Sequence, residues 1–191
     1  VLFRSDGHAH ASLFDGGKLS GAAVYRFRHN DADSLDKRLS RLGDQASRTL
    51  VIVEGLYSIL GDRAPLKEIS EVTTAHSTCL LVDEAHSLGV LGDHGRGRIE
   101  ETGVEADFVV GTFSKSLGST GGFCVSPHKA LSLFRYASRP YMFTASPCPS
   151  VIATTRAALA QLKARPELRE TLWRNANTLY DGLAQLGFQL G

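Results

Sequence analysis

Two polar segments in the sequence could carry chemistry, and each follows an aliphatic run. Asp83 directly follows one such run, and His86 lies three residues further along the chain. Lys115 lies in the segment Gly111-Thr112-Phe113-Ser114-Lys115-Ser116-Leu117-Gly118, which follows another aliphatic run. A loop of this composition offers backbone N–H groups and hydroxyls to a phosphate, with an amine within reach. The two segments therefore predict a site built from an acid, an imidazole and an amine.

An acid and an amine at neighbouring strand ends are what a pyridine-ring cofactor needs. The acid would keep the ring nitrogen protonated, so that the ring acts as an electron sink. The amine would form an imine with the cofactor and later move protons. Two simpler interpretations stay open: Asp83 as a helix N-cap or metal ligand, and Lys115 as a solvated surface side chain.

Two other motifs point to different chemistry. One is a helicase motif that would hold magnesium, and its sequence is Asp83-Glu84-Ala85-His86. That function also needs a phosphate loop with Gly before Lys-Ser/Thr, whereas Ser114 precedes Lys115-Ser116. The spacing His8-Ala9-His10 beside Asp6 occurs in metal sites, but no further cluster in the sequence completes it. Both alternatives are weaker, and we expect no metal.

Composition narrows the functional classes. The 191 residues are 42% hydrophobic and 21% charged, which is ordinary for a globular protein. The net charge of +1 and the absence of a long basic run argue against nucleic-acid binding. The apolar runs of the sequence are too short to span a bilayer. Three widely separated cysteines are typical of a reducing compartment, so we expect a cytoplasmic protein without disulfides.

The elements expected around these segments alternate strands with helices. An apolar run without alternation suits a strand buried on both faces of a parallel sheet. The runs of this kind are Leu50–Val53, Cys79–Val82 and Phe108–Val110. One helix is expected to start at Asn30-Asp31 and stop at Gly43, and another to open at Pro65. The pattern predicts an α/β fold with ligands at the carboxyl ends of its strands.

Both ends of the chain suggest a fragment of a larger protein. Residues 1–5, Val1-Leu2-Phe3-Arg4-Ser5, resemble a translated sequencing adapter, and we expect them to take no part in the fold. Residues 6–149 are expected to form part of a sheet domain. Residues 150–191 would form a helical segment leading into a truncated C-terminal domain, with a helix from Pro166 to Gly187.

Five ordered motifs resemble one known family. They are Asp6–Gly16, His29–Asp31, Val53–Ile69, Leu81–Gly97 and Gly111–Gly122. Together they are similar to the α-oxoamine synthases, which are fold-type I pyridoxal-phosphate enzymes. Three further stretches are most similar to the bacterial members that use serine and a long-chain acyl-CoA: Thr112–Ser126, Arg139–Ser146 and Leu172–Ala176.

The resemblance implies a fold, a reaction and an assembly. The fold would be the large domain of a fold-type I enzyme, with a mainly parallel central sheet. The reaction would be the decarboxylative condensation of an amino acid, here L-serine, with a long-chain acyl-CoA to give 3-ketodihydrosphingosine. The cofactor would be pyridoxal 5'-phosphate, and the assembly a homodimer with its active site at the subunit interface. Another α-oxoamine synthase or a fold-type I aminotransferase is the alternative. A non-catalytic subunit of this fold is disfavoured because such subunits usually lack the lysine found at Lys115.

The resemblance also assigns roles to the residues around the cofactor ring. Lys115 would be the Schiff-base lysine and the base that removes the Cα proton. Asp83 would pair with the pyridine nitrogen, and His86 would hydrogen-bond the phenolic oxygen. His10 would stack on the ring, and Ser58 would lie near it.

The phosphate and the substrate carboxylate complete the implied site. Thr112 and Ser114 would contact the phosphate, and Thr144 would reach the phosphate bound in a neighbouring subunit. Pro147 departs from the family pattern after this threonine, and it restricts the backbone that precedes it. The residue that holds the substrate carboxylate is expected in the C-terminal part that this chain lacks.

Overall fold

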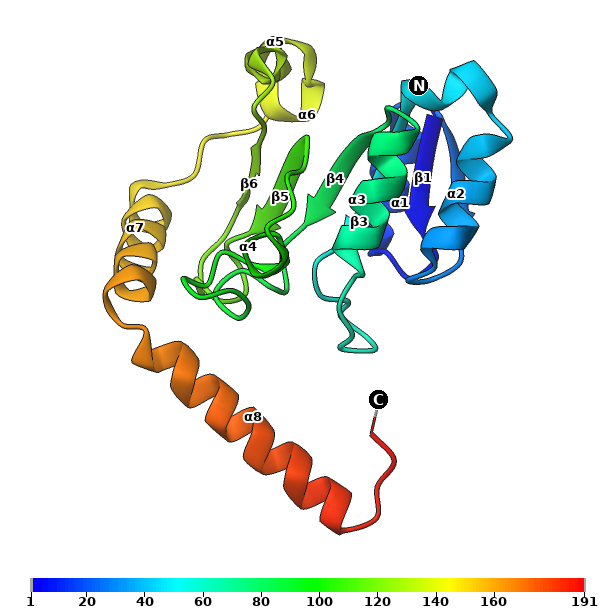
Figure 1. Cartoon of the computed structure of the whole chain (residues 1–191). Helices are drawn as coiled ribbons and strands as arrows, with labels where there is room; N and C mark the ends of the chain where they lie inside the picture. The colour runs from blue at the N-terminus through cyan, green and yellow to red at the C-terminus, as the bar shows by residue number, and fades with distance from the viewer. Residues whose placement is uncertain (1, 191) are drawn as a thin grey trace.

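A six-stranded sheet forms the body of the molecule in the computed structural model, which describes residues 2–190. The strand order is β2-β1-β3-β4-β5-β6, and all neighbours are parallel except β5 and β6, which are antiparallel (Figure 1). The strands are β1 Leu2–Asp6, β2 Ala23–Phe27, β3 Thr49–Glu54, β4 Cys79–Asp83, β5 Phe108–Thr112 and β6 Gly122–Val125. The predicted α/β fold with a mainly parallel sheet is confirmed.

Helices connect the strands and extend beyond the last one. They are α1 Ala11–Leu19, α2 Ala32–Ser40, α3 Leu66–Ala75, α4 Arg98–Thr102, α5 Phe134–Ala137, α6 Arg139–Met142, α7 Pro149–Ala164 and α8 Glu167–Gln185, with short 3-10 helices η1 Gly43–Arg48 and η2 Lys129–Leu133. The expected helix starts are confirmed. Asp31 caps α2 by accepting the N–H of Ser34 at 2.6 Å, and Pro65 precedes the first residue of α3.

The main core lies between the sheet and helices α2 and α3. Its buried side chains are Phe27, Leu35, Leu39, Val51, Val53, Tyr57, Ala64, Leu66, Ile69, Leu80 and Val82. Helix α1 covers the other face, where Gly17 approaches the side chains of Val24 and Phe3. Successive side chains of a strand point to opposite faces, so β3 buries Val51 and Val53 on one face and Ile52 on the other. This two-sided burial explains why the run is apolar without alternation.

The first strand differs from expectation. Residues 1–5 were expected to take no part in the fold, yet Leu2–Asp6 form β1 between β2 and β3. Arg4 and Ser5 are buried, and β1 pairs in parallel with both neighbours. Val1 lies outside the described residues. Backbone pairing on both sides, rather than an apolar pattern, makes this segment a strand.

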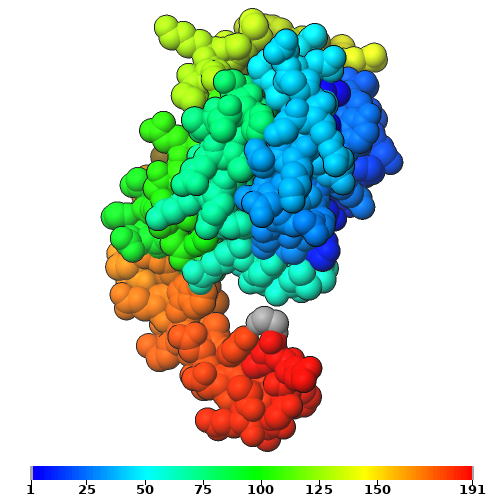
Figure 2. Space-filling view, turned by 45° about the vertical axis from the view of Figure 1, so that its right-hand side comes forward, coloured from blue at the N-terminus to red at the C-terminus, as the bar shows by residue number. Residues whose placement is uncertain are grey.

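The C-terminal helices stand away from the sheet. Helix α7 begins at Pro149, and α8 confirms the helix expected from Pro166 to Gly187. None of residues 149–185 is buried, and Figure 2 shows this orange and red part protruding from the body. Along α8, Leu172 and Leu179 are 45% and 64% exposed, so the predicted apolar stripe is largely uncovered. No helix within residues 2–190 has the length and apolar character of a membrane span.

The core makes a direct prediction about stability. Leu39 is fully buried between α2 and the sheet, whereas Leu179 lies exposed on α8. We expect Leu39→Ala to lower the free energy of unfolding by about 2–5 kcal/mol, because it removes packed methyl groups and leaves a cavity. The matched change Leu179→Ala should cost no more than about 0.5 kcal/mol. Urea unfolding followed by circular dichroism measures both, and equal costs would contradict this core.

Candidate active site

The carboxyl ends of the parallel strands bring four polar side chains to one edge of the sheet. Asp6, Glu54, Asp83 and Thr112 are the last residues of β1, β3, β4 and β5. Glu54 and Asp83 are direct partners in the register of β3 with β4. Parallel strands end on the same side, as the arrowheads in Figure 1 show. The edge therefore collects acids and hydroxyls from segments far apart in the sequence.

Asp83 is a half-buried carboxylate with few partners of its own. Its Oδ1 accepts the N–H of Ala85 at 2.8 Å. Burial raises the pKa of Asp83, although the Ala85 hydrogen bond and electrostatic interactions with Lys115, His10 and His86 act in the opposite direction. The structure thus brings these four predicted site residues within electrostatic reach of one another. A cation placed against this carboxylate would compensate for its lost hydration.

Lys115 lies in the hairpin loop, residues 113–121, that joins β5 to β6. The loop is closed by backbone bonds, including Ser119 N–H to Phe113 O at 2.8 Å and Gly118 N–H to Lys115 O at 3.0 Å. Gly121 has φ +104°, which side chains rarely tolerate. These constraints fix the loop while leaving the Lys115 side chain exposed at the sheet edge.

Two hydroxyls flank the base of this loop. The Oγ atoms of Thr112 and Ser114 lie 2.8 Å apart, and Thr112 also accepts the N–H of Ser114 at 3.2 Å. The Thr112 hydroxyl donates to the carbonyl of Gly121 at 3.1 Å. Ser114 is exposed, so its hydroxyl and the loop backbone are open to an anion.

His86 lies half-buried in the turn after Asp83. Burial lowers the pKa of His86, and the charge of Lys115 lowers it further, although Asp83 opposes both. The imidazole is therefore held neutral near physiological pH, with one N–H to donate.

His10 enters the site from the N-terminus of α1. Its Nδ1 accepts the backbone N–H of Ser12 at 3.3 Å and lies 2.8 Å from the Ser12 hydroxyl, so the side chain caps the helix. The ring is exposed. His8 points elsewhere and stacks on His29 with ring centroids 4.3 Å apart. This divergence does not favour a metal site at His8 and His10.

Glu54 is a site residue that received no role from the sequence. It is only 2% exposed, and its Oε1 accepts the backbone N–H of His10 at 2.5 Å. Burial raises the pKa of Glu54 to about 7; the neighbouring charge of Asp83 adds to the rise, while the His10 bond and the charge of Lys115 reduce it. Glu54 could have been identified from the sequence, because it directly follows an aliphatic run, as Asp83 does. Glu54 connects the end of β3 to the loop that carries His10.

Ser58 and Thr144 lie outside this cluster in different ways. Ser58 is exposed in the loop that follows β3, next to the buried Tyr57. The Thr144 hydroxyl bonds the carbonyl of Pro140 in α6. Figure 1 shows α6 beside the end of the sheet opposite to the strand ends that carry the site. Within one chain, Thr144 is therefore not brought to Lys115.

A cleft of about 540 Å³ adjoins the site. The sheet edge contributes His86 and Lys115 to its wall, and α7 and α8 contribute Leu162 and Leu168. Arg165, between the two helices, adds a positive charge to the wall. The cleft offers both apolar surface and cationic groups beside the Lys115 amine.

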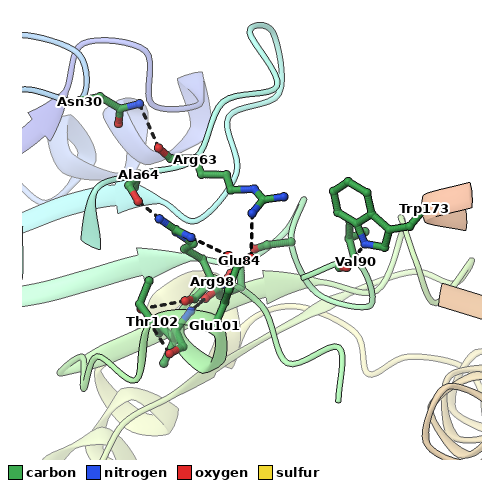
Figure 3. Close-up of polar contacts among 11 residues, drawn as sticks. Asn30, Arg63, Ala64, Glu84, Val90, Arg98, Glu101, Thr102 and Trp173 are labelled. Atoms are coloured by element: carbon green, nitrogen blue, oxygen red, sulfur yellow. Dashed lines mark hydrogen bonds and ion pairs between the residues drawn. The ribbon is translucent and has the colours of Figure 1, made fainter. Parts of the chain in front are cut away.

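An ion-pair cluster joins the loop after β3 to helix α4 (Figure 3). Arg63 and Arg98 both bind Glu101, at 2.8 and 2.6 Å, and Arg98 also donates to the carbonyl of Ala64 at 3.1 Å. The buried Glu84 accepts the backbone N–H groups of Arg98 and Ile99 at 3.0 and 2.8 Å. Because Glu84 follows Asp83 directly, this cluster fixes the backbone on which Asp83 and His86 lie.

Comparisons with known proteins agree with this architecture. The family model for aminotransferase class I and II matches residues 3–191. A serine palmitoyltransferase of Caulobacter vibrioides (strain NA1000 / CB15N) is 56% identical over 188 residues, covering 97% of this chain and 46% of the relative. An 8-amino-7-oxononanoate synthase of Symbiobacterium thermophilum is 38% identical over 189 residues, covering 98% and 48%.

A solved structure has the same fold. The serine palmitoyltransferase from S. paucimobilis with a bound PLP–myriocin aldimine superposes with a TM-score of 0.94 at 49% identity. The match covers 98% of this chain and 49% of that one. The chain therefore spans about half the length of the relatives it matches.

Glu54 generates a prediction for pH dependence. Its pKa in the folded protein, about 7, lies above its ordinary value of 4.5, so the folded state binds the proton more tightly than the unfolded state. The contribution of Glu54 to stability should therefore fall as pH rises from 4.5 to 7. Glu54→Gln removes this loss, and the variant should gain up to about 3 kcal/mol on the wild type across that range. The matched change at the exposed Glu68, Glu68→Gln, should show no such gain; parallel curves for wild type and Glu54→Gln in urea unfolding would refute the prediction.

Proposed function

The chain belongs to the aminotransferase class I and II family, and from this premise we propose that it is the cofactor-carrying part of a serine palmitoyltransferase. The reaction condenses L-serine with a long-chain acyl-CoA and releases CoA and carbon dioxide, giving 3-ketodihydrosphingosine. The observation that carries the proposal is the half-buried Asp83 carboxylate within electrostatic reach of Lys115, His10 and His86 at one sheet edge. The 56% identity to the Caulobacter vibrioides enzyme supports the choice of substrates.

The residues at this edge fit pyridoxal 5'-phosphate. Asp83 has a pKa raised by burial, and its carboxylate accepts a hydrogen bond from Ala85, so a protonated ring nitrogen at its free positions would further stabilise its charged form. The Thr112 and Ser114 hydroxyls, with the loop N–H groups, would bind the phosphate. When bound, the cofactor supplies the electron sink that spreads the negative charge developed at the substrate Cα.

Each side chain then has a defined task. Asp83 would hold the proton on the ring nitrogen through a short, charge-assisted hydrogen bond. Lys115 would anchor the cofactor covalently through Nζ and, once freed by the substrate amine, would take the Cα proton. The neutral His86 would donate its N–H to the phenolic oxygen of the ring. His10 would lie against the ring face, and Ser58 near the ring.

The alternatives differ in substrate rather than in machinery. An 8-amino-7-oxononanoate synthase or a 2-amino-3-ketobutyrate CoA ligase would use another amino acid or acyl-CoA, and a fold-type I aminotransferase would use a 2-oxo acid. The relative named 8-amino-7-oxononanoate synthase is 38% identical, against 56% for the serine palmitoyltransferase. This difference favours serine.

We also propose a homodimer whose active site lies at the subunit interface, in a cytoplasmic enzyme. The segment that carries Thr144 supports an interface, because aromatic side chains on it are unusually exposed: Tyr136 at 76%, Tyr141 at 63% and Phe143 at 76%. In such a dimer Thr144 would reach the phosphate of the neighbouring subunit. Residues 2–149 would belong to the large domain, because Leu2–Asp6 form a strand of its sheet, and residues 150–191 would lead into the C-terminal domain.

Substrate choice is tested with the full-length protein that contains this chain. Serine, glycine, alanine and threonine are each offered with a panel of acyl-CoAs, and a 2-oxo acid is offered separately. We expect product of the mass of 3-ketodihydrosphingosine from serine and palmitoyl-CoA. A faster reaction with another amino acid, or turnover only with the 2-oxo acid, would assign the chain to one of the alternatives.

The role of Lys115 is tested by substitution. Lys115→Ala should abolish covalent cofactor attachment, read as a mass increase after borohydride reduction, and should lower turnover by roughly 10²- to 10⁴-fold. Lys129→Ala changes another exposed lysine and should leave both unchanged. Covalent attachment in Lys115→Ala, or turnover equal to that of the wild type, would disprove the assignment.

A further inference from the structure

His29 lies between two carboxylates beside the candidate site. It follows β2, and its Nδ1 and Nε2 are each 2.7 Å from a carboxylate oxygen, of Asp6 and Asp62 respectively. Asn30 adds two bonds: its backbone N–H donates to Asp6 at 2.9 Å and its side-chain amide to Asp62 at 2.8 Å. These four residues, Asp6, His29, Asn30 and Asp62, form what we call the His29 cluster.

The cluster requires a doubly protonated ring. An ionised carboxylate only accepts hydrogen bonds, so each ring nitrogen must donate, and only the imidazolium has two N–H groups. Burial lowers the pKa of His29, but the hydrogen bonds and charges of Asp6 and Asp62 outweigh it, and the net shift is upward. The ring also stacks on His8 at 4.3 Å and meets the edge of Tyr57 at 4.5 Å. Among the described residues, these are the titratable groups that face it.

Asp6, at one end of the His29 cluster, accepts hydrogen bonds from the loop that carries His10. Asp6 is 1% exposed, and its Oδ1 also accepts the backbone N–H of His8 at 2.8 Å. The Asp6 carbonyl accepts the N–H of Ala9 at 3.2 Å. The turn between β1 and α1 is thus organised around the carboxylate that His29 neutralises. His10 follows this turn directly.

Asp62, at the other end of the His29 cluster, lies in the loop that carries Ser58 and bonds within it. Asp62 lies in this loop, and its carbonyl accepts the N–H of Tyr57 at 2.9 Å. Asn30 donates to the adjacent carbonyl of Arg63 at 3.2 Å, a contact drawn in Figure 3. The loop is therefore tied to the residues after β2 at Asp62 and at Arg63, on the far side of Ser58 from β3.

We propose that His29 is a positioning residue, whose two hydrogen bonds hold the His10 loop and the Ser58 loop in one fixed arrangement beside the cofactor site. The inference rests on the proposed function for the identity of the cofactor, but the coupling of the two loops is a property of the chain itself. Within residues 2–190 the ring contacts Asp6, His8, Tyr57 and Asp62, so it acts through the loops. Its own chemistry is confined to bearing a positive charge between two negative ones.

The coupling is tested by hydrogen exchange in the cofactor-free, full-length protein. In His29→Gln the carboxamide is neutral and donates from one atom only, so both carboxylates lose the charge of the ring and at least one loses the hydrogen bond from residue 29. We expect backbone exchange to rise by about tenfold or more in residues 7–12 and 55–63 together, as expected for loss of a hydrogen bond to a charged group. The matched control is His76→Gln: His76 has similar side-chain exposure, 19% against 17%, and also binds a carboxylate at 2.7 Å, that of Asp36. It should leave both segments unchanged.

Unchanged exchange in His29→Gln, or a change in only one loop, would overturn the proposal. If His29→Gln does not fold, Asp62→Asn takes its place, since Asp62 is 39% exposed and the amide keeps the shape of the side chain. This variant should lower the His29 pKa, followed by NMR titration of the ring, and should raise exchange in both loops. A loop response without a pKa change, or neither effect, would also overturn it.

Cofactor binding separates this inference from the proposed function. If the wild type binds pyridoxal phosphate, His29→Gln should weaken binding or lower kcat by about tenfold or more, while His76→Gln stays within about twofold. Equal behaviour of the two variants would refute the positioning role. A wild type that binds no pyridoxal phosphate but shows coupled exchange would refute the proposed function and leave the loop coupling in place.

The cluster also predicts a pH dependence of stability. The His29 pKa is raised in the folded protein above its ordinary value of 6.5, so its contribution is complete below pH 6.5 and disappears as pH rises through the folded value. The stability difference between wild type and His29→Gln should therefore be larger at pH 6 than at pH 9 or above. Urea unfolding at the two pH values measures it, and a difference that grows with pH would contradict the charged ring.

Discussion

The parallel backbone pairing of β3 with β4 is the constraint on which the site depends. It places Glu54 opposite Asp83, and pairing of β4 with β5 brings the Lys115 hairpin to the same edge. Side chains separated by many residues thus meet without any helix or loop having to reach across the sheet. The core beneath them includes the fully buried Val53 and Val82, which directly precede Glu54 and Asp83 in their strands. A polar site on regular strands is held more precisely than one on loops alone.

Burial gives the acidic groups at this edge their chemical character. Asp83 and Glu54 lose hydration at the strand ends, and each has a raised pKa. Neither carboxylate is fully compensated by its own hydrogen bonds, so the site favours a cation such as a protonated pyridine. His29 shows the opposite case, because two carboxylates more than offset its burial. The same edge therefore contains two acids with raised pKa near Lys115 and, next to them, a histidine bonded to two carboxylates.

The strands that are buried on both faces were predictable from the sequence, because a short unbroken aliphatic run is typical of a strand covered on both sides. Three strands were not predicted: β1, whose Arg4 and Ser5 are polar yet buried, β2, a mostly exposed strand at one edge of the sheet, and β6, a short strand that follows the glycine-rich hairpin loop. All three owe their structure to pairing with neighbours, which is non-local. The apolar stripe of α8 was predicted correctly as a helix, but not as an exposed one: Leu179 remains 64% exposed in this chain.

By itself, the sequence determined which residue types stand at the strand ends, since the hydrophobic runs stop at Glu54, Asp83 and Thr112, and the motifs around them identified the family. Only the tertiary structure decided which of those groups interact. In the folded chain the His10 backbone N–H donates to Glu54, and His29 lies between Asp6 and Asp62. The reason is physical: a strand end is encoded by local hydrophobicity, but a hydrogen bond across 23 to 44 residues depends on strand order and register.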